Sequence, residues 1–412
     1  MEVEELITEI GTYPETWTID RVDTVFDLIQ GKQVSERNRI GDNQRPFLRT
    51  KNVFWNRLEL AELDQMHFSA AEEARYALLP GDLLLCEGGD VGRTAMWRGE
   101  VERCYIQNHL HRLRAFDSMV DPQYAVFWFW YAFNVGNLYI GRGNKTTIPN
   151  MSRSKLAELQ IALPPLPEQQ CIAQVLSTVQ EAIAQQERLI CTTTELKQAL
   201  MQKLFTEGLR GEALKETEIG RMPESWEVVP LREVIRVMHG YAFKGEHFTD
   251  DGPIVLTPGN FKLEGGLYWG DRTKYTTEEC PPEYVLQPGE LVLVMTDLTP
   301  SAKLLGGPAF IPQGKVILHN QRIGKIDLLG SQTSLDFLYW VFLSSRFRLH
   351  MAQTATGSTV RHTSPTRITD FLVALPSKKE QAEMCGALHR VDDKLAALER
   401  KHVSSPKIRC VG

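Results

Sequence analysis

Two glycine-rich segments are the first places to look for chemistry, because such loops can hold phosphate groups against backbone N–H groups. GGDVGRT (88–94) is shorter than a phosphate-binding loop and has Arg93 where that loop requires lysine. GRGNKTT (141–147) lacks the third glycine of a dinucleotide-binding fingerprint. We interpret the first segment as a tight turn between strands and the second as a loop that presents polar side chains.

Other reactive side chains are scattered along the chain. CPPEY (280–284) has the prolines and aromatic residue of the catalytic element of amino-methyltransferases, but it lacks the preceding acid or amide that would hold the target amine. The ten histidines form no His-Glu-x-x-His motif, and the seven cysteines form no Cys-x-x-Cys pair. We therefore predict no catalytic residue, no metal site and no cofactor on this chain.

Cations, amides and aromatic residues gather in GKQVSERNRIGDNQRPFLRTKNVFWNR (31–57). Arginine can contact guanine with two hydrogen bonds, asparagine or glutamine can do so with adenine, and other cations can neutralise phosphates. A solvated loop explains any single member equally well, but it explains the whole cluster less well. In the first half of the chain, the residues predicted to contact DNA are Lys32, Asn43, Gln44, Arg45, Arg49, Lys51, Asn52, Arg93, Arg142, Asn144 and Lys145.

Similar side chains recur in the second half of the chain. The residues predicted to contact DNA there are Lys244, Asn260, Lys303, Arg361 and His362. The net charge of −6 is unusual for a DNA-binding protein, because such proteins usually carry an excess of cations. The prediction therefore requires that positive charge be local or that a partner supply it.

The elements that must position these side chains occur twice. EIGTYPETW (9–17) returns as EIGRMPESW (218–226), and LPGDLLL (79–85) returns as QPGELVL (287–293). FWFW (127–130) returns as FLYW (337–340), and LPPLPEQQCIAQVLSTVQEAI (163–183) returns as LPSKKEQAEMCGALHRVDDKL (375–395). Landmarks repeated in one order at a nearly constant spacing indicate two copies of a unit of about 210 residues.

Each copy is predicted to be a mixed globular domain followed by a long helix. Short β-rich runs at 82–86 and 289–295 follow Pro-Gly turns, and an aromatic helix is expected near 122–134 and again near 334–349. The predicted fold class is α+β, with two homologous domains in tandem and two antiparallel coiled-coil helices related by a pseudo-two-fold axis. The predicted domains are 1–162 and 211–374, and the predicted helical segments are 163–210 and 375–412.

Proline-rich residues 164–167 precede the first helix, which is predicted over about 167–205 and would be roughly 60 Å long. Its apolar residues follow the 3.5-residue period of a coiled-coil seam. The residues predicted to pair the helices are Ile172, Leu176, Val179 and Ile183 with Met384, Leu388, Val391, Leu395 and Leu398. The alternative is a helical hairpin buried in one large core.

The second helix is predicted to be the shorter one. Ser404, Ser405 and Pro406 interrupt it, and proline inside a helix costs about 3 kcal/mol, so we expect it to stop near His402. Antiparallel pairing would then leave part of the first helix uncovered. The apolar residues predicted to bind a partner or a second copy of this chain are Ile190, Leu196, Leu200 and Leu204.

The repeated elements resemble a known family. LPPLPEQQCIAQVL and LPSKKEQAEMCGAL are similar to the segments that close each recognition domain in specificity subunits of type I restriction-modification systems. LKQALMQKLFTEGLRGE (196–212), the restart EIGRMPESWEVVPL and VMTDLTPSAKLLG (294–306) are similar to that family as well. The resemblance covers nearly the whole chain.

The resemblance implies a non-catalytic subunit in which each target-recognition domain reads one half of a bipartite double-stranded DNA sequence. The helices would set the spacer between the halves and bind two methyltransferase subunits, on which S-adenosylmethionine is expected. Two restriction-translocase subunits can join such a complex. The shortened second helix departs from the family pattern, and this puts the closed pairing of the two helices in doubt.

Two other function classes compete with this interpretation. A DNA adenine methyltransferase with fused recognition domains would need a cofactor loop and an acid or amide before Pro281, and both are missing. A protein-only coiled-coil adapter would show no salt-sensitive DNA binding. Without an apolar stretch of about 18 residues or an apolar leader, we expect a cytoplasmic prokaryotic protein that does not enter a membrane.

Overall fold

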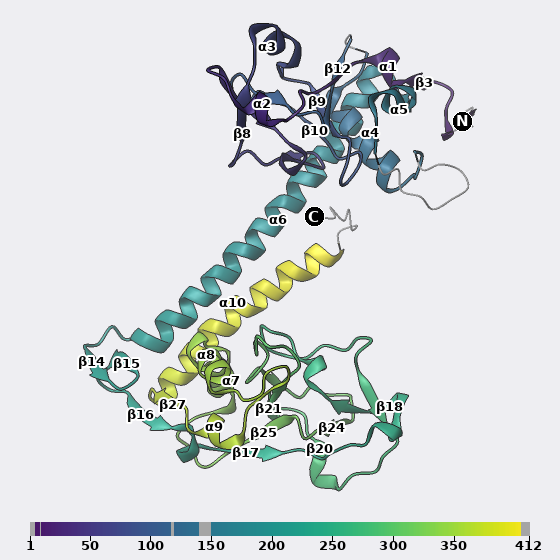
Figure 1. Ribbon diagram of the computed structural model, residues 1–412. Coiled ribbons are helices and arrows are strands. Elements are labelled where there is room, and N and C mark those ends of the chain that lie inside the picture. Colours follow the sequence, from purple (N-terminus) through teal and green to yellow (C-terminus); the bar gives the residue numbers. More distant parts are fainter. Residues whose placement is uncertain (1–4, 9, 117–118, 140–149, 405–412) are drawn as a thin grey trace. The chain divides into compact units, whose positions relative to one another are not determined.

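The computed structural model describes residues 5–8, 10–116, 119–139 and 150–404 (Figure 1). Its contacts divide the chain into a first unit, Met1–Gln185 with Ser405–Gly412, and a second unit, Gln186–Ser404. Each unit combines helices with small sheets, as an α+β fold requires. Among the described residues, none of the helices is both long and apolar enough to cross a membrane.

The first unit contains short strands and helices. Its strands are β1 (Glu5–Thr8), β2 (Gly11–Pro14), β3 (Thr18–Arg21), β4 (Phe26–Gln30), β5 (Gln44–Leu48), β6 (Val53–Phe54), β7 (Arg57–Leu58), β8 (Asp64–His67), β9 (Leu83–Cys86), β10 (Thr94–Met96), β11 (Tyr105–Ile106), β12 (Leu110–Ala115) and β13 (Gln160–Leu163). Its shorter helices are α1 (Val22–Val25), α2 (Glu36–Arg39), η1 (Thr50–Asn52), α3 (Ala70–Tyr76), α4 (Pro122–Asn134) and α5 (Arg153–Glu158).

Strand β9 lies inside the main sheet of the first unit, whose antiparallel order is β10-β9-β12-β4. Because side chains alternate along a strand, Leu83 and Leu85 face a core that contains Phe129 of α4, whereas Leu84 and Cys86 face a second core. Both faces of the strand are therefore buried, which explains its continuous apolar run. A second sheet has the order β11-β5-β8.

GGDVGRT forms the turn between the antiparallel strands β9 and β10, as predicted. Gly92 has a φ of 88°, which favours glycine, and a Cβ atom there would lie 2.6 Å from the ring of Phe133. Gly92, the third glycine of the segment, is therefore required by backbone conformation and by packing. A phosphate ligand is not needed to explain it.

The second unit repeats this plan. Its strands are β14 (Leu214–Thr217), β15 (Gly220–Pro223), β16 (Glu227–Pro230), β17 (Ile235–His239), β18 (Phe248–Leu256), β19 (Lys274–Thr276), β20 (Val285–Leu286), β21 (Leu291–Val294), β22 (Thr296–Asp297), β23 (Pro308–Phe310), β24 (Ile317–His319), β25 (Ile323–Leu328), β26 (Arg361–His362) and β27 (Leu372–Leu375). Its shorter helices are η2 (Leu231–Glu233), η3 (Gly245–His247), η4 (Pro258–Asn260), η5 (Pro282–Tyr284), α7 (Leu335–Leu343), α8 (Ser345–Thr354) and α9 (Pro365–Thr369).

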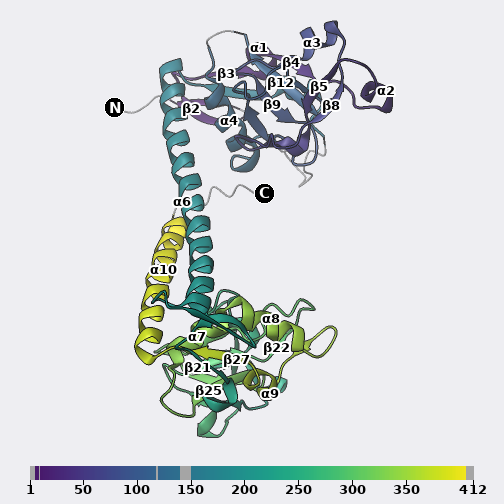
Figure 2. The ribbon, with the colours of Figure 1, turned by 90° about the vertical axis from the view of Figure 1, so that its left-hand side faces the viewer.

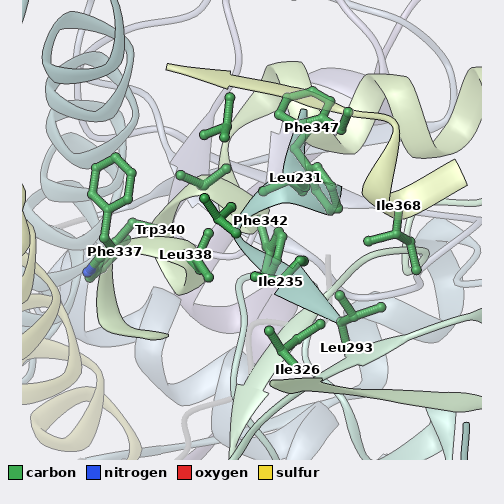
Figure 3. Close-up of a cluster of buried hydrophobic side chains, with 14 of the residues drawn as sticks. Leu231, Ile235, Leu293, Ile326, Phe337, Leu338, Trp340, Phe342, Phe347 and Ile368 are labelled. Carbon is green, nitrogen blue, oxygen red and sulfur yellow. The ribbon is translucent and has the colours of Figure 1, made fainter. Parts of the chain in front are cut away.

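The main sheet of the second unit has the order β17-β25-β21-β23, which matches β4-β12-β9-β10 in the first unit strand for strand. Leu293 and Ile326 of this sheet pack with Phe337 and Phe342 of α7 and with Phe347 of α8 (Figure 3). A second sheet has the order β19-β18-β24-β20. The duplication read from the sequence is therefore also a duplication of strand order.

A buried glutamine fastens each long helix to its domain. Gln169 in α6 (Leu166–Glu207) donates to the carbonyl oxygens of Met119 and Pro164, and its own oxygen accepts from the N–H of Asp121. Gln381 in α10 (Lys378–Ser404) donates in the same way to the carbonyl oxygens of Gln332 and Pro376. The repeated Glu-Gln pair of the sequence therefore marks a structural anchor.

Helix α10 runs antiparallel to the end of α6 within the second unit, and both views show the two side by side (Figures 1 and 2). Gln186 donates to the carbonyl oxygen of Leu398, and Lys197, further along α6, pairs with Asp392, which lies earlier in α10. The ammonium group of Lys197 also lies 5.2 Å from the ring centroid of Trp340. These contacts fix the register of the two helices.

The structure corrects one prediction about the far half of α6. Leu204 is 2% exposed in the core of the second unit and Leu200 packs against that core, so neither is left for a partner. The prediction was wrong because it assumed that α6 is a spacer along its whole length. The last turns of α6 pack in the second domain. Leu196 is 57% exposed, and Ile190 is half-buried.

The residues predicted to pair the helices also contribute to the domain cores. Met384 and Leu388 are fully buried in the core of the second unit, and Ile172 packs against the core of the first. Leu395 and Leu398 are buried, whereas the others are half-buried or, at Val179, exposed. Each helix is therefore part of a domain over some of its length.

Candidate nucleic-acid interface

Lys32 is a structural cation, which corrects its predicted contact with DNA. Its ammonium group donates to the carboxylate of Glu72 at 2.8 Å and to the carbonyl oxygen of His67 at 2.6 Å. It also lies 5.0 Å from the ring centroid of Phe68. The residue is 6% exposed, so its charge is satisfied inside the protein and is not presented to a ligand.

The carboxylate of Glu73 accepts hydrogen bonds from three polar side chains in or near the predicted cluster. Arg45 donates to it at 2.7 Å, Asn43 at 2.9 Å and Arg103 at 2.8 Å. The hydrogen bonds from Arg45, Asn43 and Arg103 lower the pKa of Glu73 to about 2. Arg45 and Asn43 therefore order the segment that carries them, and any contact they make with DNA requires exchange of these bonds.

Asn52 and Asn260 are buried, and for both the prediction of a DNA contact is wrong. The side-chain oxygen of Asn52 accepts from the N–H of Arg49 at 2.9 Å, and its amide nitrogen donates to the carbonyl oxygen of Glu59. Asn260 accepts from the N–H of Thr257 at 3.1 Å in the corresponding short helix. Both amides satisfy backbone groups that the turn would otherwise leave unpaired.

Arg49 and Lys51 remain on the surface beside Asp64. Arg49 donates to Asp64 at 2.7 Å, and the ammonium group of Lys51 lies 3.7 Å from the same carboxylate. Arg49 lowers the pKa of Asp64, mainly through this hydrogen bond. Arg93 is half-buried and donates to the carbonyl oxygen of Thr50. The shared carboxylate offsets part of the positive charge expected here.

Six more predicted contacts fall into three groups. Gln44 donates to two nearby carbonyl oxygens of its own segment. Lys244 and Lys303 are exposed, and in the described part of the chain their ammonium groups have no ion pair. The predicted contacts that lie outside the described residues are Arg142, Asn144 and Lys145.

Arg361 and His362 form strand β26, which pairs with β22. Arg361 donates to the carbonyl oxygen of Ala352 and thereby holds its own segment against α8. His362 is exposed and lies 3.1 Å from the hydroxyl of Thr296 through its Nδ1 atom. Arg361 is therefore chiefly structural, whereas His362 keeps an exposed edge.

A polar hollow that the sequence did not reveal lies beyond the end of β4. It has a volume of about 430 Å³, and the polar side chains that line it are Gln30, Gln33, Arg75, Asn108 and Arg153. Arg75 and Arg153 are exposed, and among the residues that the structure describes neither forms an ion pair. Free guanidinium groups around a concave polar surface are suited to contact phosphates.

A second hollow, of about 530 Å³, is lined by Arg37, Asn38 and His67, and it also contains Lys32. Lys32 lines this second hollow, and the next residue, Gln33, lines the first. Sequence reasoning missed this surface because its members come from segments more than a hundred residues apart, such as Gln33 and Arg153. Only the contact of those segments in the fold brings the side chains together.

Comparison with known proteins identifies relatives across most of the chain. Residues 14–190 and 223–404 match the family described as type I restriction modification DNA specificity domain. The MjaVIII type I restriction enzyme specificity subunit of Methanocaldococcus jannaschii is 25% identical over 395 residues, which cover 94% of this chain and 88% of that protein. The EcoKI specificity subunit of Escherichia coli is 25% identical over 228 residues, which cover 52% of this chain and 45% of that protein.

The fold is also found in a solved structure. The crystal structure of a type I restriction-modification S subunit from M. genitalium aligns with a TM-score of 0.55 and 16% sequence identity. The alignment covers 94% of this chain and 92% of that chain. The similarity therefore includes both copies of the repeated unit.

Proposed function

This chain belongs to the family of type I restriction-modification DNA specificity subunits, and we propose that it reads a split double-stranded DNA target, one half with each unit. The observation that carries this proposal is the repeated framework. The main sheets have the same strand order, and Asn52 and Asn260 close the same short helix in the two units. Two equivalent frameworks with different exposed side chains fit two different DNA segments.

The surface beyond β4 supports DNA as the ligand of the first unit. Arg37, Arg75 and Arg153 are exposed around two polar hollows, so they can neutralise phosphates without breaking ion pairs. The amides of Gln33 and Asn108 lie among them and can hydrogen-bond to base edges. Local positive charge of this kind answers the objection raised by a net charge of −6.

The chain itself is proposed to be non-catalytic, with two methyltransferase subunits bound to its helices and S-adenosylmethionine held by those partners. Two restriction-translocase subunits would complete a nuclease. Leu189 and Leu196 support a protein partner, because they expose 46% and 57% of their surface on α6. Apolar side chains exposed on a long helix favour protein contact over contact with DNA.

Reconstitution with a type I methyltransferase tests this proposal. The complex should methylate a split sequence, and its affinity for that sequence should fall steeply as salt rises, because bound cations displace counterions from DNA. The chain alone, incubated with S-adenosylmethionine and DNA, should transfer no methyl group. Methyl transfer by the partner-free chain, or salt-independent binding by the complex, would overturn the proposal.

A further inference from the structure

Two turns occupy the same backbone position in the two units. The N–H of Asn108 donates to the carbonyl oxygen of Lys32 at 2.8 Å, and the N–H of Gln321 donates to that of Tyr241 at 2.9 Å. One residue further on, the carbonyl oxygen of His109 accepts from the N–H of Glu87, as that of Arg322 does from Met295. Asn108 therefore corresponds to Gln321, and His109 to Arg322.

Each turn packs against a glycine at a position that has no room for a side chain. A Cβ atom on Gly31 would lie 2.3 Å from the carbonyl oxygen of Gln107, and one on Gly240 would lie 2.4 Å from that of Asn320. Gln107 and Asn320 are themselves 4% and 7% exposed. Close backbone packing thus fixes the first residue of each turn inside the protein.

The next two residues of each turn face outward. Gln321 and Arg322 are exposed, Asn108 is half-buried at the polar hollow, and His109 exposes 58% of its side chain. Within the described ranges, no side-chain hydrogen bond or ion pair holds Asn108, Gln321 or Arg322. The turns therefore present an unpaired amide followed by a cation or a histidine.

Neighbouring groups hold the first turn in place without using the side chain of Asn108. Gln30 donates to the carbonyl oxygen of Asn108 at 2.8 Å and to the carboxylate of Glu87 at 3.0 Å. That carboxylate lies 3.7 Å from Nδ1 of His109. A rigid backbone limits the entropy lost when an exposed side chain binds, so the turn is suited to selective hydrogen bonding.

We propose that the turns 107–109 and 320–322 read bases, one in each half of the target, and that Asn108 and Gln321 are specificity-determining residues. This inference rests on the proposed function. The edge of adenine can accept one hydrogen bond from a side-chain amide and donate another to it. The edge of guanine has two acceptors, which match the guanidinium group of Arg322. The turn in the first unit, with His109 in place of arginine, reads a different base at the second position.

Substitution in the reconstituted complex tests the inference. Gln321→Ala should lower affinity for the target roughly tenfold and relax selection at one position of one half-site, since it removes both hydrogen bonds of a bidentate base contact. It should leave the salt dependence unchanged, because glutamine carries no charge. Arg221→Ala is the control for Arg322→Ala, since Arg221 is also exposed but lies in the hairpin β14–β15, where it pairs with Glu216.

A transplanted turn sharpens the test. Asn108→Gln combined with His109→Arg should change the base selected in the first half-site and leave the second half-site intact, as read by sequencing methylated random DNA. The inference fails if the complex methylates a split site but neither Gln321→Ala nor the double variant Asn108→Gln with His109→Arg alters any selected base. If Arg322→Ala weakens all sequences equally and lowers the salt slope by about one, Arg322 contacts phosphate and its assignment to guanine is wrong. Failure of the wild-type complex to select any sequence would instead overturn the proposed function.

Discussion

At the scale of single residues, asparagine performs a repeated structural task in this protein. Asn260 is fully buried, accepts from the N–H and hydroxyl of Thr257, and donates to the hydroxyl of Thr273. Asn52 has the same position in the first unit. A side-chain amide is suited to this place because it supplies both a donor and an acceptor to the half-buried groups around it.

Asn260→Ala should therefore destabilise the second unit by about 2 kcal/mol, because it removes a fully buried amide and leaves its half-buried partners without their hydrogen bonds. Lys262→Ala, at an exposed position two residues away, is the control and should change stability by less than about 0.5 kcal/mol. Urea denaturation measures both. Equal stability of the Asn260 variant and the wild type would show that the amide is not needed to close the turn.

His319 gives the protein a predictable response to acid. Burial lowers the pKa of His319, and its Nε2 atom lies 2.8 Å from the carbonyl oxygen of Ile323. The unfolded chain therefore binds a proton near pH 6.5 that the folded protein excludes. Stability from this group is present above that pH and is lost as pH falls below it.

The urea concentration at the unfolding midpoint of the wild type should accordingly decrease when the pH is lowered from 7.5 to 5.5. The decrease should be smaller in His319→Gln. His362→Gln is the control for the loss of an imidazole ring at an exposed position. An identical pH dependence in wild type and His319→Gln would contradict a neutral buried histidine.

Residue types alone could not separate structural amides from those that face a ligand. Asn52 and Asn108 are the same amino acid, yet Asn52 is buried on the backbone of its own segment and Asn108 faces the hollow beyond β4. Lys32 was likewise predicted from composition, but its partner Glu72 lies 40 residues away. Which polar groups are already paired depends on contacts that only the fold supplies.

At the scale of elements, the sequence predicted the positions of helices and strands better than it predicted the roles of single polar residues. Apolar runs and Pro-Gly turns located β9 and β21, and the aromatic run located α4. These signals are local, so they do not depend on distant contacts. The single helix predicted near 334–349 is instead two helices, α7 and α8, separated at Ser344. The end of α6 was misinterpreted because one apolar period is compatible both with a coiled coil and with packing on a domain.

A pair of substitutions on α6 separates these two environments. Leu204→Lys should destabilise the second unit by about 3 kcal/mol or more, because Leu204 is 2% exposed in its core. Leu196→Lys, on the same helix at a position that is 57% exposed, should leave stability nearly unchanged. Thermal unfolding compares them, and a folded, equally stable Leu204→Lys protein would mean that the domain does not cover this end of the helix.

At the scale of the whole molecule, duplication gives a physical basis for the proposal that one chain serves two DNA segments. Each unit has its own cores, so a substitution in one core need not disturb the other. The frameworks agree in strand order, whereas the exposed turns differ, with Asn108 and His109 in one and Gln321 and Arg322 in the other. If each unit reads one half-site, as we propose, this arrangement would allow the two half-sites to change independently.

The most direct test of this account is to exchange residues 10–162 for the equivalent domain of another family member and to sequence the sites that the reconstituted methyltransferase complex modifies. One half of the recognised sequence should be replaced by that of the donor protein, and the other half should remain that of the wild type. A change in both halves, or in neither, would contradict the assignment of one half-site to each unit.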